Sequence, residues 1–255
     1  MDLRLPTHFG EGYKSASQLA RRITEPWGTE NLYCCACVSD HLNPEKNNAQ
    51  VSDFRCPQCV ERYQLKSHSK KLGGTILGSN YQKMVDAING NESPNFFLLH
   101  YQLPEWLVRN LLVIPRFAIS PSVIIKRKPL SSAAERSQWT GYVLNVRLIP
   151  DSAKISLILE GSEVNRRVVR EQYSRIARIA GLKPEQRGWT LDVLRCVESL
   201  SDAPFTNDEV YAFEPALAKL YPGNRHIKDK IRQQLQVLRD RGFLKQVQRG
   251  VWQRL

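Results

Sequence analysis

One stretch of the sequence decides the fold: Val51-Ser-Asp-Phe-Arg-Cys-Pro-Gln-Cys-Val-Glu-Arg-Tyr-Gln-Leu-Lys66. Its ends, 51–54 and 62–66, are typical of β-strands, and the Cys-x-x-Cys turn between them predicts a hairpin. Side chains alternate along a strand with a period of two, so Gln64 and Lys66 project to the same face. If the two strands pair, Asp53 can reach that face as well.

These three residues suit metal-dependent cleavage of a phosphodiester. The Asp53 carboxylate and the Gln64 carbonyl would offer oxygen ligands to magnesium, which prefers them. Lys66 would orient and help deprotonate the attacking water and would counter the charge of the transition state. A plainer interpretation places Asp53 in a turn and the other two on a solvated strand edge. Spacing alone favours that plainer interpretation.

The turn of the hairpin carries half of a four-cysteine set with two Cys-x-x-Cys spacings, which is typical of a structural zinc site. The set consists of Cys34, Cys37, Cys56 and Cys59. Cys35 could replace Cys34, but the matched spacing of the two pairs places Cys35 outside the site. We expect Cys196 to lie in a helix core. The first residues lack the apolar run of a secretory signal, which favours zinc in a reducing cytoplasm over disulfides.

Composition narrows the class of protein. The chain has 255 residues, of which 42% are hydrophobic, as in an ordinary globular protein. No run is apolar enough for a membrane span, so no membrane partner is expected. The formal net charge of +12 favours a polyanionic partner, most simply nucleic acid. Charge alone leaves the question open, because a basic protein can simply be soluble.

Periodicity divides the chain at a composition shift in 181–188, where we expect a linker. Before it, helices are predicted over 12–24, ended by Pro26, and over 81–88. Strands are predicted over 95–101, 110–115, 122–125 and 155–159, which indicates an α/β core. After it, helices over 190–200, 206–219 and 224–241 precede a hairpin formed by 243–247 and 251–254. Those parts are typical of a winged helix, with Gly242 ending the last helix.

The last predicted helix is basic on its exposed side. Between residues 224 and 254 there are nine Lys or Arg and two acids. An apolar stripe of Ile227, Ile231, Leu235 and Leu238 repeats at helical spacing and should be buried. The residues outside the stripe that suit phosphates and base edges are Arg225, His226, Lys228, Arg232 and Gln233. A merely solvated face is the alternative.

The chain resembles the DpnI-type methyl-directed restriction endonucleases over essentially its whole length. The resemblance rests on several colinear segments: Tyr13-Lys14-Ser15 with Gln18, the knuckles around Asp53, Pro94–Phe97, Ile124–Leu130, Arg187–Thr190, His226–Lys228 and Ile231–Leu235. It implies an α/β PD-(D/E)XK nuclease core with an embedded four-cysteine zinc site, over residues 1–183. An α+β winged-helix DNA-binding domain would follow over residues 184–255.

The resemblance also implies a function. The family cleaves both strands of adenine-methylated DNA at a GATC-like site by metal-assisted attack of water, with Mg²⁺ as catalytic and Zn²⁺ as structural ion. It assigns the metal carboxylate to Asp53 and the catalytic lysine to Lys66. The middle acid of the family motif falls on residue 64, where this chain has glutamine. Glu11 or Glu25 could supply the missing charge. Glu61 could supply it only if a β-bulge turned its side chain to the same face as Gln64.

Reading a methyl group requires an apolar contact, and Trp139 matches a tryptophan of the family. We expect Trp139 to pack against the N6-methyl groups, with an ordinary core tryptophan as the alternative. The expected partner is double-stranded DNA carrying N6-methyladenine, bound by a monomer in a bacterial cytoplasm. Two other functions stay open: a non-catalytic reader of methylated DNA with a decayed metal site, and a zinc-ribbon winged-helix regulator. The regulator would leave residues 60–180 without a role.

Overall fold

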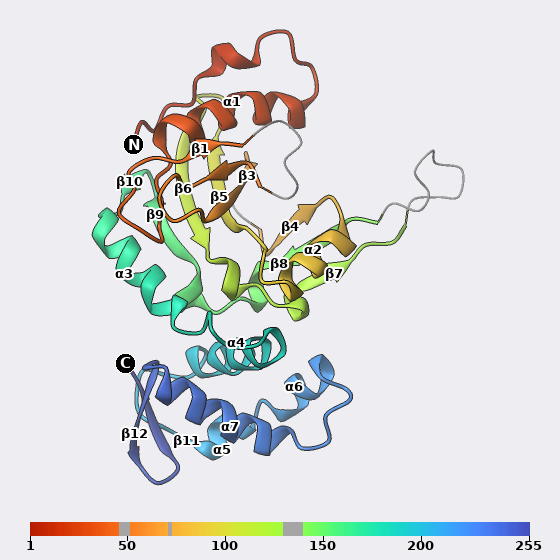
Figure 1. Ribbon diagram of the computed structural model, residues 1–255, viewed down its shortest axis with the longest axis vertical. Helices are drawn as coiled ribbons and strands as arrows, with labels where there is room; N and C mark the ends of the chain where they lie inside the picture. The colour runs from red at the N-terminus through yellow and green to blue at the C-terminus, as the bar shows by residue number, and fades with distance from the viewer. Residues whose placement is uncertain (46–51, 71–72, 130–139) are drawn as a thin grey trace.

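The computed structural model describes residues 1–45, 52–70, 73–129 and 140–255 (Figure 1). Its main feature is a seven-stranded sheet in the order β1-β2-β3-β5-β6-β9-β10. The strands are β1 (Asn43–Pro44), β2 (Phe54–Arg55), β3 (Arg62–His68), β5 (Asn95–Gln102), β6 (Leu107–Ile114), β9 (Ile155–Leu159) and β10 (Ser162–Glu163). Strands β3 and β5 are parallel, and the other neighbours are antiparallel.

The centre of the sheet is apolar on both faces. All but two residues of β5 are buried, as expected for a strand covered on both sides. In β3 the burial alternates, because Tyr63 and Leu65 are buried whereas Gln64 and Lys66 are only partly covered. The predicted strands over 95–101, 110–115 and 155–159 are therefore confirmed. The hairpin strand predicted at 51–54 is instead Phe54–Arg55, and Val51 lies outside the described residues.

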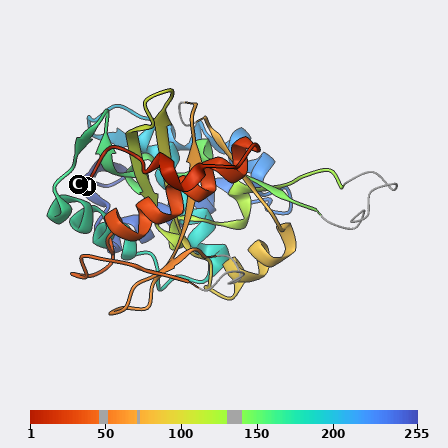
Figure 2. The same ribbon diagram turned by 90° about the horizontal axis from the view of Figure 1, so that it is seen from above.

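Helix α1 (Ala16–Asn31) lies across the sheet and packs against β3, as Figure 2 shows from above. The prediction that Pro26 ends this helix is wrong, since Pro26 lies inside it. An internal proline costs about 3 kcal/mol. Here the burial of Ile23 and Trp27, one turn apart on the same face, offsets that cost. Gly28 lets the sheet pack closely against α1, because a Cβ added at this glycine would lie 2.7 Å from the Phe54 ring.

A smaller sheet with the order β4-β8-β7 flanks the main one. Its strands are β4 (Thr75–Gly78), β8 (Tyr142–Asn145) and β7 (Ile124–Lys126), and helix α2 (Tyr81–Asn89) packs against β7. Helix α2 confirms the prediction over 81–88. The strand predicted over 122–125 begins only at Ile124, because Pro121–Val123 form a 3₁₀ turn.

The last third of the chain is helical and ends in a hairpin. Its elements are α3 (Arg166–Ala177), α4 (Pro184–Glu198), β11 (Phe205–Thr206), α5 (Asn207–Tyr211), α6 (Glu214–Leu220), α7 (Ile227–Asp240), β12 (Leu244–Gln248) and β13 (Val251–Arg254). The single helix predicted over 206–219 is wrong, because it is broken between α5 and α6. Helix α7 starts at Ile227, not at residue 224. Gly242, with φ of +72°, follows α7 as predicted.

Helix α4 lies between the main sheet and the C-terminal helices (Figure 1). The predicted linker at 181–188 is therefore largely wrong, since α4 begins at Pro184. Arg187 of α4 is 1% exposed and donates to the Asn91 side chain at 3.2 Å. Asp192, one turn further on, accepts hydrogen bonds from Tyr221 at 2.6 Å and from Ser122 at 3.3 Å. Among the described residues, no helix combines the length and apolarity that a membrane crossing requires.

Candidate active site and zinc centre

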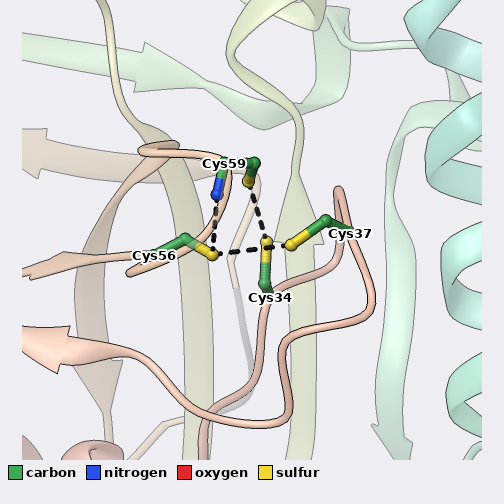
Figure 3. A group of neighbouring side chains, drawn as sticks. All are labelled: Cys34, Cys37, Cys56 and Cys59. Atoms are coloured by element: carbon green, nitrogen blue, oxygen red, sulfur yellow. Dashed lines mark hydrogen bonds between the residues drawn. The ribbon is translucent and has the colours of Figure 1, made fainter.

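The four predicted cysteines converge from two loops (Figure 3). Cys34 and Cys37 follow α1, and Cys56 and Cys59 occupy the turn between β2 and β3. Their sulfur atoms all lie within 4.8 Å of one another, and two pairs are 3.5 Å apart. A tetrahedral zinc with Zn–S bonds of about 2.3 Å places sulfurs roughly 3.8 Å apart. The cluster therefore fits a structural zinc ion.

Backbone N–H groups surround the sulfur atoms. Cys37 Sγ accepts from Ser39 at 3.5 Å, and Cys56 Sγ accepts from Gln58 and Cys59 at 3.4 and 3.5 Å. Burial alone would raise the pKa of the Cys56 thiol, but these donors and the neighbouring thiols outweigh it and bring the pKa to about 7. Thiolates are the form that binds zinc, so these donors favour the ligating state at Cys56, whereas burial raises the pKa of the Cys34 and Cys59 thiols.

The two remaining cysteines lie outside this cluster, as the spacing predicts. The Cys35 sulfur is buried beside the Tyr33 carbonyl, 3.9 Å away, and Cys196 is buried in α4. Helix α3 supports the loop that carries Cys34 and Cys37, because Arg170 donates to the carbonyl oxygens of Cys34 and Ser39 at 3.3 and 3.1 Å. The cysteine cluster is therefore attached both to the hairpin and to α3.

Asp53 lies where β2 meets β3. Its backbone N–H donates to the Tyr63 carbonyl at 2.8 Å, and its carboxylate Oδ2 accepts the Leu65 N–H at 2.8 Å. Leu65 stands between Gln64 and Lys66, so this bond brings the Asp53 carboxylate to the Gln-x-Lys segment. The alternating burial of β3 puts Gln64 and Lys66 on one face, as expected. The structure thus brings the three predicted catalytic residues together.

Asp53 and Lys66 influence each other's charge. Burial raises the pKa of Asp53, while the Leu65 N–H and the nearby Lys66 and Arg21 work against that rise. Burial also lowers the pKa of Lys66, against the attraction of Asp53. A divalent cation would relieve the cost of ionising the buried carboxylate. A lysine with a lowered pKa gives up its proton more readily, which suits a group that accepts a proton from water.

Of the acids considered as helpers, Glu61 and Glu25 are each paired with an arginine. Glu61 does not join Asp53, because both of its carboxylate oxygens accept from Arg116 Nε at 3.1 Å. Glu25 pairs with Arg21 at 2.6 Å. Arg21 lies within electrostatic reach of both Asp53 and Lys66. Arg21 could not be singled out from the sequence, since nothing in the local pattern of α1 marks which arginine faces β3.

The predicted DNA-contacting residues, two just before α7 and three within it, are exposed. These are Arg225, His226, Lys228, Arg232 and Gln233. The apolar stripe behind them is buried, as predicted. Lys228 lies 3.6 Å from Glu214 of α6, and a hollow of about 270 Å³ separates α7 from the hairpin, lined in part by Arg232 and Arg249. Trp139 lies outside the described residues.

Comparison with known families matches both parts of the chain. Residues 1–181 match the DpnI family model, described as the Dam-replacing family. Residues 185–254 match the DpnI C-terminal model, described as the Dam-replacing helix-turn-helix domain. The first match covers the part of the chain that forms the main sheet and the smaller β4-β8-β7 sheet, and the second covers the C-terminal helices and hairpin. The chain therefore belongs to the Dam-replacing family, as a DpnI-type methyl-directed endonuclease with a C-terminal winged helix.

Proposed function

We propose that the protein is a type II restriction endonuclease that hydrolyses both strands of DNA carrying N6-methyladenine at a GATC-like site. The nuclease domain would be a PD-(D/E)XK core over residues 1–183, and the winged-helix domain would span 184–255. The observation that carries the proposal is the Asp53 carboxylate bonded to the Leu65 N–H, between Gln64 and Lys66. That bond joins the acid and the Gln-x-Lys segment into one site.

Each residue has a role in this proposal. Asp53 and the Gln64 carbonyl would hold Mg²⁺, which when bound would polarise the scissile phosphate and acidify water. Lys66 would orient the attacking water and take up its proton, which its lowered pKa favours. The exposed Arg21 guanidinium adds positive charge beside the place where the phosphate would lie. Glutamine at position 64 keeps an oxygen ligand but removes one negative charge from the metal site.

The winged helix would hold the DNA. The exposed basic and amide side chains of α7 suit contacts with phosphates and with base edges in the major groove. Trp139 would contact the methyl groups, and Trp139→Ala should then reduce discrimination between methylated and unmethylated duplexes. Sequencing the ends of digested genomic DNA would identify the target.

A second function is favoured by Gln64. A site that lacks one acid would bind Mg²⁺ more weakly, and a chain that no longer cuts would be a reader of methylated DNA. Incubating adenine-methylated plasmid with Mg²⁺ or Mn²⁺ separates the two functions. The nuclease fragments the plasmid, whereas a reader shifts methylated DNA in a gel and leaves it intact.

Asp53→Asn is the sharper test of the site. The amide oxygen of asparagine can still accept the Leu65 N–H, so the fold should survive while the charged metal ligand is lost. We expect cleavage to be abolished and binding of methylated DNA to be retained. Cleavage by this variant at the wild-type rate would rule out the role of Asp53.

A further inference from the structure

Tyr63 lies between the zinc centre and the candidate nuclease site. It stands on β3 directly before Gln64 and is fully buried. Its phenolic oxygen is 3.2 Å from Cys34 Sγ. Its backbone carbonyl accepts the Asp53 N–H at 2.8 Å. One residue therefore contacts a cysteine of the zinc cluster through its side chain and the metal carboxylate residue through its main chain.

The direction of the bond to sulfur follows from the other partner of the hydroxyl. The Tyr63 oxygen accepts the Cys35 N–H at 3.2 Å, so its own proton remains available for donation. A cysteine that binds zinc has lost its proton and can only accept. Tyr63 therefore donates to the Cys34 thiolate when zinc is bound. Such outer donors orient a metal ligand and stabilise its charge.

The Tyr63 ring has little room to move. It is stacked on Phe97 of β5, with ring centroids 4.9 Å apart and an angle of 14° between the ring planes. Phe97 is itself fully buried in the central strand. A shift of the Cys34 sulfur would therefore move the β3 backbone, rather than only rotate the Tyr63 side chain. The backbone at this point carries two of the hydrogen bonds that place Asp53, at the Tyr63 carbonyl and at the Leu65 N–H, and a third joins the Asp53 carbonyl to the Glu45 N–H.

We propose that Tyr63 is a positioning residue through which zinc at the cysteine cluster sets the placement of Asp53 against the Gln64–Lys66 segment. This inference rests on the proposed function for its catalytic consequence. It gives zinc a second role besides holding the hairpin closed. Loss of zinc, or of the Tyr63 hydroxyl alone, would loosen the catalytic residues while the winged helix stays able to bind DNA.

The test compares Tyr63→Phe with a matched control, Tyr33→Phe. The Tyr33 ring is also fully buried beside the same cysteines, but within the described part of the chain its hydroxyl has no hydrogen-bond partner. Zinc release to a chromogenic chelator is the first measurement. Tyr63→Phe should release zinc faster than the wild type, by up to about 10- to 100-fold, because removing an outer partner of a metal ligand lowers metal affinity by that factor. Tyr33→Phe should match the wild type.

The second measurement is hydrogen exchange in the segments 52–56 and 62–68. In the wild type, removing zinc should speed exchange of the Asp53 and Leu65 amides. In Tyr63→Phe the exchange should already be fast with zinc bound. Single-turnover cleavage of methylated duplex should fall about tenfold in Tyr63→Phe at saturating zinc, with gel-shift affinity unchanged.

Three results would overturn the inference. The two variants could release zinc at the same rate, or exchange of the Asp53 and Leu65 amides could be the same with and without zinc. Tyr63→Phe could also cleave DNA at the full rate despite losing zinc faster. Failure of the proposed function would give a different experimental result. A wild-type protein that does not cut methylated DNA would end the nuclease proposal, and the exchange measurement would still decide whether Tyr63 transmits the zinc state to Asp53.

Discussion

Replacing Glu61 by glutamine tests whether this acid stabilises the fold or serves the metal site. Both Glu61 oxygens accept from Arg116 Nε at 3.1 Å, and Oε2 also accepts from the Asn95 amide at 2.9 Å. About a fifth of each charged side chain is exposed. A second cation, Arg187, lies close by. Burial lowers its pKa most, and the charge of Arg116 lowers it further. Glu61→Gln would therefore leave Arg116 without its carboxylate, with the positive charge of Arg187 nearby.

The expected cost follows from this geometry. Breaking a fully buried ion pair by removing one partner costs about 3–5 kcal/mol. Because this pair is partly exposed and glutamine can still accept one bond, we expect about 2 kcal/mol. In a domain of this size each kcal/mol moves Tm by about 2–4 °C, so Tm should fall by about 4–8 °C. Glu30→Gln, at an exposed position of α1, is the control and should leave Tm unchanged.

Differential scanning calorimetry and a cleavage assay below the transition give the two measurements. The variant should lose stability and keep cleavage of methylated DNA within about twofold of the wild type, per folded molecule. An unchanged Tm would show that the Arg116 pair contributes nothing. Abolished cleavage by a folded variant would show instead that Glu61 supplies charge to the metal site.

Three further predictions test the candidate site, the domain junction and the DNA surface. Gln64→Glu restores the missing charge, so the Mg²⁺ concentration for half-maximal cleavage should fall several-fold in a metal titration; an unchanged or higher value would contradict the ligand role. Burial raises the pKa of Asp192 above its unfolded value of about 3.9, so this carboxyl contributes stability below about pH 4 that is lost as the pH rises through the raised pKa. Asp192→Asn should therefore gain Tm relative to the wild type at pH 7 and lose that gain near pH 4, and a pH-independent difference in thermal melts would refute this. Arg232→Ala should weaken binding of methylated and unmethylated duplexes alike and reduce the salt slope by about one in gel shifts, whereas a loss confined to methylated DNA would indicate base or methyl reading.

The sequence predicted the elements whose signals are local. The central strands appear as short apolar runs bounded by polar residues or proline, and the last hairpin has its glycine turn. Predictions from local sequence failed where contacts between residues distant in the sequence determine the structure. Pro26 reads as a helix end, yet Trp27 directly after it is buried and its indole N–H donates to the Asp2 carbonyl at 2.8 Å. Residues 184–188 read as a linker, yet Arg187 and Trp189 are buried at the junction that α4 forms.

The site was predictable in its residue types and not in its geometry. Alternation placed Gln64 and Lys66 on one face because both stand on one strand. No pattern shows that the Asp53 carboxylate accepts the Leu65 N–H, since this depends on how β2 meets β3. Tyr63 could have been noticed as the residue before Gln64. Its contact with Cys34 could not, because it needs the two knuckles to be brought together.

The dimensions of the hairpin suggest why a metal-binding cysteine cluster would lie beside the proposed nuclease site. Strands β1 and β2 are two residues long each, too short to hold a fixed position through their own ladder. Asp53 directly precedes β2, so its placement depends on what closes the loop on the other side, at Cys56 and Cys59. Closing that loop through four thiolates removes conformational freedom that the short strands cannot remove. A catalytic carboxylate must be held within about 0.5 Å of its productive position. A zinc ion at the cysteine cluster would therefore support the proposed site where the sheet itself is weakest, and the buried Tyr63 hydroxyl between them is the place to test that support.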